Sequence, residues 1–179
     1  MKSYTKYTLI LSSILLASCV NQNTKIAANI MPTTNACTKL DLLKNAYYKD
    51  FESLKEIKTS GRASNIWRAK YQLFGENCQV FSWGGKQHTY SCRLVAPDEE
   101  TAKNYYQSAK KITQECLGEE WTLEESNRAH DDGMKTSFVN HSAKPSEKVT
   151  FSTHLVPSSG VFSTTWTIFY YVGNSSQPK

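Results

Sequence analysis

Apolar residues recur at helical spacing over a long stretch near the start of the chain. Between Thr38 and Lys58 they return every three or four residues, which is the period of one face of an α-helix. This stripe consists of Leu40, Leu43, Tyr47, Phe51, Leu54 and Ile57. Thr38 followed by Asp41 resembles a capping box with Asp in the place of Glu, and Ser60-Gly61 would end the helix. The spacing therefore predicts a core-facing helix over residues 38–58.

A second helical pattern lies between Asp98 and Gly118. Asp98 is a suitable N-cap, the acidic Glu99 and Glu100 suit the positive end of the helix dipole, and Gly118 suits the C-terminal cap. The residues expected on its buried stripe are Ala102, Tyr105, Ala109, Ile112 and Cys116. Each of these features has a structural explanation that requires no function.

The residues between the two helices alternate as strands do. Strands are expected over residues 66–74, 78–83 and 87–95, with a turn at residues 75–77. Gly84-Gly85 is a hairpin signal between the second and third of them. If Cys78 faces Cys92 across this hairpin, Val80 pairs with Tyr90 and Phe81 pairs with Thr89.

After the second helix the pattern indicates an antiparallel meander. Turn signals at residues 131–133, 144–147 and 157–160 separate strands expected over residues 121–125, 134–141, 149–155 and 162–170. Aromatic residues lie on both faces of the last strand. The resulting expectation is a single α+β domain with about six to seven mostly antiparallel strands, two helices packed on one face and two disulfides.

The start of the chain has the three-part layout of a secretory signal. Lys2 and Lys6 form a basic start, Tyr7 to Leu16 is mostly apolar and uncharged, and small residues follow. This apolar run is about half of the ~20 residues that a membrane-spanning helix needs. The alternative is an ordinary secretory signal in which the cysteine at position 19 occurs by chance.

The four residues Leu16-Ala17-Ser18-Cys19 resemble the lipobox of bacterial lipoprotein precursors. The resemblance implies cleavage before Cys19, a thioether-linked diacylglycerol on its thiol, and an acyl chain such as palmitate on the new amino group. Val20 follows Cys19, and no Asp occupies that place, which resembles the outer-membrane default of Gram-negative lipoproteins. The implied location is the cell envelope, at the outer membrane, with the domain facing the periplasm or the cell surface.

The domain organisation follows from these boundaries. Residues 1–18 would be the signal peptide, residues 19–36 the lipidated cysteine with a polar, flexible tether, residues 37–173 the domain, and residues 174–179 a frayed tail. A flexible tether of this length spans roughly 20–25 Å on average. The domain would then lie close to the bilayer and be free to reorient.

The charge balance argues against a nucleic-acid partner. The formal net charge is +5, and loss of Lys2 and Lys6 with the signal leaves 5 − 2 = +3. This is a mild excess without a dense run of Lys and Arg, and an exported protein rarely meets nucleic acid.

Cysteine usage agrees with an oxidising compartment. Besides Cys19 there are four cysteines, an even number that indicates two disulfides in an exported chain. The hairpin register favours Cys78–Cys92, which leaves Cys37–Cys116, and antiparallel helices would bring those two ends together. A metal site is the competing interpretation, but no CxxC pair is present and the spacings do not match zinc motifs. We therefore expect neither a metal nor another cofactor.

Candidate catalytic groups are sparse. The four histidines, at positions 88, 130, 141 and 154, show no HExxH-like spacing, and exposed or hydrogen-bonded histidine is expected for each. Glu124 and Glu125 could act as an acid/base pair, but adjacent strand residues point to opposite faces, so they would not converge on one substrate. His130 with Asp131 is the other candidate pair.

The position of Trp83 beside the hairpin turn is compatible with a binding role, because burial is difficult at a turn. The alternative is that Trp83 folds back onto Phe81 or a helix as an edge of the core. Lys86 and His88 flank it and could complement an acidic partner. We therefore expect a lipid-anchored module that binds an envelope protein and lacks catalysis of its own, as an inhibitor or immunity-type protein or as an accessory to envelope assembly. The alternatives are an enzyme acting on cell-wall or envelope material and a carrier of a small ligand.

Overall fold

The computed structural model describes six stretches of the chain: residues 35–59, 65–82, 87–129, 131–144, 147–160 and 163–173. The first half contains α2 (Ala36–Tyr47), the 3-10 turn η1 (Glu52–Leu54), β1 (Lys55–Thr59), β2 (Asn65–Ala69), β3 (Glu76–Ser82) and β4 (His88–Ala96). The second half contains α3 (Glu99–Leu117), β5 (Thr122–Asn127), β6 (Met134–Val139), β7 (Thr150–Ser159) and β8 (Thr164–Gly173).

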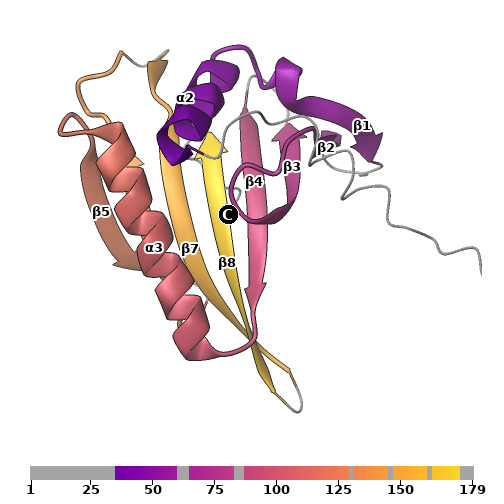
Figure 1. The fold of residues 1–179 in the computed structure, drawn as a ribbon, viewed down its shortest axis with the longest axis vertical. Helices are drawn as coiled ribbons and strands as arrows, with labels where there is room; N and C mark the ends of the chain where they lie inside the picture. The colour runs from indigo at the N-terminus through magenta and orange to yellow at the C-terminus, as the bar shows by residue number, and fades with distance from the viewer. Residues whose placement is uncertain are drawn as a thin grey trace, which may run out of the picture.

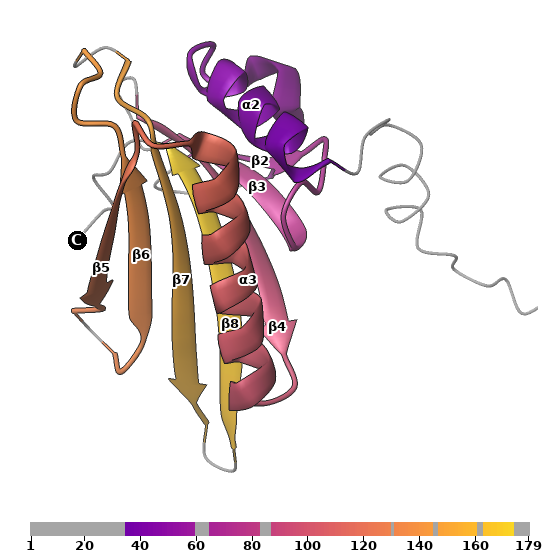
Figure 2. The ribbon, with the colours of Figure 1, turned by 60° about the vertical axis from the view of Figure 1, so that its left-hand side comes forward.

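All eight strands form one antiparallel sheet in the order β1-β2-β3-β4-β8-β7-β6-β5. Both helices lie on the same face of this sheet (Figures 1 and 2). The α+β class, the antiparallel sheet and the two disulfides are confirmed. The expected number of six to seven strands is wrong, because β1 lies inside the region where the first helix was expected.

The two halves of the domain repeat one order of elements, a helix followed by a four-stranded meander. The halves meet where β4 pairs with β8 in the middle of the sheet, from Thr89 opposite Gly173 to Ala96 opposite Trp166. The connectivity therefore places the first half at the β1 edge and the second half at the β5 edge. No sequence repeat accompanies this repeat of topology.

The first helix is shorter than its apolar stripe predicts. Asn35, rather than Thr38, is the N-cap, since its side chain accepts a hydrogen bond from the Thr38 backbone N–H at 3.0 Å. The helix ends at Tyr47 because Asp50 and Phe51 adopt left-handed conformations, with φ of 53° and 56°. Phe51 is nevertheless fully buried, so core burial offsets its backbone strain. The expected termination at Ser60-Gly61 lies outside the described residues.

The stripe prediction is correct for the residues that reach the core and wrong at its end. Leu40, Leu43, Phe51 and Leu54 are buried, whereas Ile57, expected on the same stripe, is 58% exposed on β1. After residue 54 the chain is a strand, so the side-chain period changes from 3.6 residues to 2. Ile57 therefore points away from the core.

The second helix begins and ends as predicted but is rotated from the predicted orientation. The Asp98 side chain accepts the Thr101 N–H at 2.7 Å, and Gly118 is the C-cap residue. Its φ of 78° is positive, but its ψ of −175° differs from the left-handed helical cap that the sequence predicted. The buried residues are Ala102, Tyr106 and Thr113. Tyr105 and Ile112, expected on the buried stripe, are 42% and 36% exposed.

The strand boundaries differ from the predictions mainly around β2 and β7. The strand expected over residues 66–74 ends at Ala69, and the following loop brings Phe74 onto Tyr170 at a ring-centroid distance of 4.6 Å. The turn expected at residues 157–160 is instead strand as far as Ser159. The hairpin register is confirmed, with Val80 opposite Tyr90 and Phe81 opposite Thr89.

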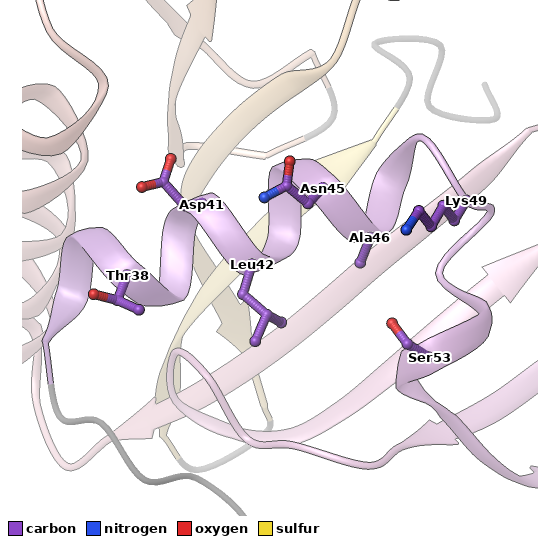
Figure 3. A pocket seen from close by; sticks show the side chains of 7 residues that line it. All are labelled: Thr38, Asp41, Leu42, Asn45, Ala46, Lys49 and Ser53. Atoms are coloured by element: carbon purple, nitrogen blue, oxygen red, sulfur yellow. The ribbon is translucent and has the colours of Figure 1, made fainter.

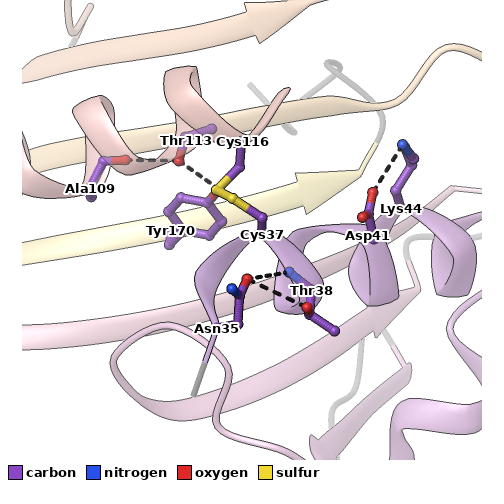
Figure 4. The surroundings of a disulfide bond; sticks show 9 residues. All are labelled: Asn35, Cys37, Thr38, Asp41, Lys44, Ala109, Thr113, Cys116 and Tyr170. Atoms are coloured by element: carbon purple, nitrogen blue, oxygen red, sulfur yellow. Dashed lines mark hydrogen bonds and ion pairs between the residues drawn. A yellow bond between two sulfur atoms is a disulfide. The ribbon is translucent and has the colours of Figure 1, made fainter. Parts of the chain in front are cut away.

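Both predicted disulfides are present. Cys78–Cys92 lies in the sheet beneath α2 with both residues buried, whereas Cys37 is exposed where α2 begins and Cys116 is half-buried at the end of α3. Figure 4 shows the interhelical bridge beside the hydrogen bond, 2.9 Å long, between Thr113 and Tyr170. This bridge ties the beginning of the described chain to the C-terminal end of α3.

Candidate functional site

The candidate partner-binding residues lie at the hairpin between β3 and β4. Trp83 and Lys86 are outside the described residues, as are Cys19 and His130. His88 is described: it opens β4 opposite Ser82, on the same face as the helices. The structure therefore places one of the three candidate residues, at the base of the hairpin.

A surface groove runs along the outer side of α2 and has a volume of about 400 Å³ (Figure 3). Leu42 and Ala46 supply its apolar surface, and polar or charged side chains surround them. The full lining is Thr38, Asp41, Leu42, Asn45, Ala46, Lys49 and Ser53. Five of these residues belong to α2, Lys49 lies two residues beyond its end, and Ser53 comes from η1. We call this feature the α2 groove.

The groove forms because the side of α2 that no other described segment covers, called its uncovered side below, is only partly polar. Leu42 is half-buried and packs against the core from beside the main stripe. The left-handed turn at Asp50 and Phe51 then brings η1 back beneath the helix end, so Ser53 closes the groove. Leu42 and Ala46, spaced four residues apart, were the available sequence signal, but only the packed structure shows which side of the helix is uncovered.

His88 and Asp50 form a polar pair beside the groove. His88 Nε2 lies 3.6 Å from Asp50 Oδ1, and the His88 side chain is 13% exposed. Burial lowers the pKa of His88; Asp50 and Glu52 act to raise it, and Lys55 acts to lower it. The buried Nδ1 atom of His88 has no hydrogen-bond partner among the described residues.

The α2 groove is linked to the Asp50–His88 pair and the base of the hairpin through consecutive residues. Lys49 lines the groove, Asp50 follows it directly, and Asp50 contacts His88 at the foot of the hairpin. Tyr47 and Tyr48 hold this end of α2 by donating hydrogen bonds from their hydroxyls to the Lys148 and Glu147 carbonyls. We refer to the α2 groove together with Asp50 and His88 as the α2 site.

A second polar cluster lies on the sheet face opposite α2 and α3, which carries no helix in the described part of the chain and is called the helix-free face. Arg128 donates from one terminal nitrogen to Nδ1 of the fully buried His154 at 2.6 Å, and its Nε–H is shared between the two carboxylate oxygens of Asp131 at 2.9 and 3.0 Å. Since Arg cannot accept a hydrogen bond, Nδ1 is the acceptor, and Nε2 carries the proton that it donates to Ser152 Oγ at 3.2 Å. His154 is thus hydrogen-bonded, as expected.

This arrangement does not prepare Ser152 for nucleophilic attack, because His154 presents a donor to the serine rather than a lone pair. Burial is the main factor that lowers the pKa of His154 to about 3, and the neighbouring Arg128 contributes. The cluster instead fastens the β5–β6 connection to the sheet. Gly133 is required there, since a Cβ atom at this position would lie 2.2 Å from the Leu155 carbonyl oxygen.

The two glutamates considered as an acid/base pair do not lie together. Glu124 lies on the helix-free face and pairs with His141 at 3.1 Å, whereas Glu125 lies on the helix face near Tyr106 and Lys110. They therefore point to opposite faces, as the strand pattern predicts. Among the described residues, no cluster of three or more His, Cys, Asp or Glu side chains could hold a metal ion. No helix in the described part of the chain is long and apolar enough to span a bilayer.

The architecture defines an α+β domain built from two helix-plus-meander halves, with a surface groove on its first helix. Comparison with protein-family models, with curated proteins and with solved structures finds no match.

Proposed function

We propose that this chain is a lipid-anchored cell-envelope protein whose domain binds another envelope protein through the α2 site. The observation that carries the proposal is the continuity of the α2 groove with the Asp50–His88 pair at the base of the hairpin that carries Trp83. Apolar surface edged by polar groups is the usual composition of a recognition patch. The role is that of an inhibitor or immunity-type protein, or of an accessory to envelope assembly.

The charge of the first half of the domain favours an acidic partner surface. Residues 35–96, which build α2 and the first four strands, contain ten Lys and Arg against five Asp and Glu. Lys49 lies in the groove itself, and Lys86 follows the hairpin glycines in the sequence. The site itself holds Lys49 against Asp41 and Asp50, so the positive excess lies in the surrounding first half of the domain, where it speeds association with a negative surface.

The lipobox supports binding of the partner close to the membrane. The proposed tether, residues 19–36, runs directly into α2, and the groove begins at Thr38. The α2 site would then lie at the end of the domain nearest its anchor. We therefore propose that the partner meets the domain close to the membrane.

Site-specific photocrosslinking in intact cells tests the binding role. A photocrosslinking residue at Asn45, which is exposed in the groove, should capture an envelope protein, whereas the same residue at the exposed Gln107 of α3 should not. With the crosslinker moved to Ser53, Asn45→Trp should fill the groove and reduce capture. Trp83→Ala should also reduce capture while leaving thermal stability unchanged.

Two results would contradict this assignment. Full capture by stable Asn45→Trp and Trp83→Ala proteins would exclude the α2 site as the binding surface. A loss of about 3 kcal/mol or more in Trp83→Ala would place this side chain in the core instead, since that is the usual cost of truncating a buried aromatic residue.

A further inference from the structure

The edge of the sheet farthest from β1 is an open strand. β5 pairs with β6 without a register shift over all six of its residues, from Thr122 opposite Val139 to Asn127 opposite Met134. It is the last strand in the sheet order, so no described strand lies on its other side (Figure 2). A regular strand with one unpaired side is a template for strand addition.

The antiparallel pattern identifies which backbone groups face outward. Arg128 N–H donates to the Gly133 carbonyl at 2.9 Å, which makes this a hydrogen-bonded pair. Because such pairs alternate with non-hydrogen-bonded pairs, residues 126, 124 and 122 bond to β6. The N–H and C=O groups of Leu123, Glu125 and Asn127 therefore point away from the sheet, where they could bind another strand.

This edge is also strongly acidic. Residues 97–173 contain seven Lys and Arg against eleven Asp and Glu, the reverse of the first half. Four glutamates lie on β5 or just before it: Glu119, Glu120, Glu124 and Glu125. Only weak, partly exposed ion pairs counter them in the described structure, with Lys110 lying 3.5 Å from Glu125 and His141 lying 3.1 Å from Glu124.

The opposite edge of the sheet lacks this regularity. β1 has a register shift between Lys55 and Lys58, and both lysines lie over the Trp67 ring, at 4.4 and 5.9 Å from its centroid. Bulges and lysines are the features by which edge strands avoid pairing. β1 of a second copy is therefore a poor match for β5, although it carries the complementary charge.

We infer that the outer edge of β5 binds an extended, basic segment of a partner protein as a ninth strand. The segment would bond to the outward backbone groups of Leu123, Glu125 and Asn127. Since Glu124 and Glu125 lie on opposite faces, two consecutive Lys or Arg residues would present one cation to each carboxylate. The inference rests on the proposed binding role but concerns a surface distinct from the α2 site.

A synthetic peptide tests this surface directly. The probe is the capped octapeptide TVTKKTVT, titrated at low salt into the full mature protein labelled with ¹⁵N, and its control is TVTEETVT. Binding of the lysine peptide should slow hydrogen exchange of the Leu123, Glu125 and Asn127 amides and should weaken with added salt. Failure to bind, equal binding of the glutamate peptide, or protection located elsewhere in the domain would overturn the inference.

A matched pair of variants separates strand addition from charge attraction alone. Asn127→Pro removes one outward N–H while keeping the β6 ladder, so it should weaken peptide binding by about tenfold, whereas Asn127→Ala should not. Equal binding by both would overturn strand addition. Glu124→Gln should weaken binding and reduce its dependence on salt.

The two proposed surfaces can be tested independently of each other. The groove-filling Asn45→Trp protein should bind the lysine peptide normally, and loss of crosslinking at Asn45 would count against the α2 site alone. In cells, a photocrosslinker at Ser126 should attach to a Lys- or Arg-bearing segment of another protein. Attachment to β1 of a second copy would overturn the assigned partner.

Discussion

His154 is fully buried on the helix-free face of the sheet, among groups of both charges. Arg128 and Lys135 disfavour its protonation, Asp131 favours it, and the Tyr171 ring packs against it at a centroid distance of 4.9 Å. Burial outweighs the single carboxylate, so the folded state holds the imidazole neutral. Protonation would also place a positive charge directly against the Arg128 guanidinium.

This burial predicts a loss of stability in acid. Between the ordinary pKa of 6.5 and the folded pKa of about 3, the unfolded chain binds a proton at His154 that the folded protein excludes. The titration of His154 therefore leaves the free energy of unfolding unchanged above about pH 6.5. Below that pH it lowers the free energy of unfolding by roughly 1.4 kcal/mol per pH unit, until the pH reaches about 3. Urea unfolding at several pH values should show this slope, and His154→Gln should reduce it. An unchanged slope in the variant would contradict the assignment.

The orientation of α3 shows how side-chain contacts decide between two similar helix faces. Position 106 lies about 100° around the helix from position 105, and both residues are tyrosine. Tyr106 is buried because its hydroxyl lies 2.5 Å from Thr136 Oγ1 on β6. Thr113, a polar residue that an apolar stripe omits, is likewise buried against the Tyr170 hydroxyl.

The two tyrosines should therefore differ as substitution sites. Tyr106→Ala should lower the free energy of unfolding by about 3 kcal/mol or more, because it leaves a cavity and removes the partner of Thr136. Tyr105→Ala, at a 42% exposed position, should cost less than about 1 kcal/mol. Chemical denaturation of the two variants measures the difference, and equal losses would contradict this orientation of α3.

The disulfides act on different parts of the fold. Cys78–Cys92 spans 14 residues within one hairpin, whereas Cys37–Cys116 spans 79 residues and joins the two helices. In the chain-entropy account these contribute about 3 and about 4–5 kcal/mol. The interhelical bridge is a covalent link between the two repeated halves, which also meet through the β4–β8 pairing and the packing of their helices.

At the scale of the whole molecule, the two halves of the domain differ in net charge, and the sheet order places them at opposite ends. Residues 35–96 carry a net charge of +5 and residues 97–173 carry −4. Because β1 and β5 are the two edges of the sheet, the basic and acidic halves lie at opposite ends. The half that carries the α2 site therefore favours an acidic partner, and the edge at β5 favours a basic one.

The proposed lipid anchor can be tested directly at Cys19. Mass spectrometry of protein purified from membranes should show a mature chain that begins at Cys19 and carries added acyl mass, because the lipobox resemblance implies cleavage and lipidation there. Cys19→Ser should release the protein from the membrane fraction. An unmodified Cys19 thiol in the mature chain, or an unchanged location of the variant, would contradict lipidation.

The sequence by itself determined the features that depend on local periodicity and on pairs of residues. These include the α+β class, the caps at Asp98 and Gly118, the register of the β3–β4 hairpin and both disulfides. The class, the caps and the register follow from side-chain period and cap chemistry, which neighbouring residues specify. The disulfides follow from the even number of cysteines and from the hairpin register, which favours Cys78–Cys92 and leaves Cys37–Cys116.

Only the tertiary structure decided where distant segments meet. The left-handed turn at Phe51, the rotation of α3 toward Thr136 and the uncovered side of α2 each depend on burial against residues far along the chain. The outward groups of β5 likewise become an edge only once the order of the strands is known. Local propensity differs by only tenths of a kcal/mol between such alternatives, whereas burial of an aromatic side chain contributes about 1.5–3 kcal/mol and selects among them.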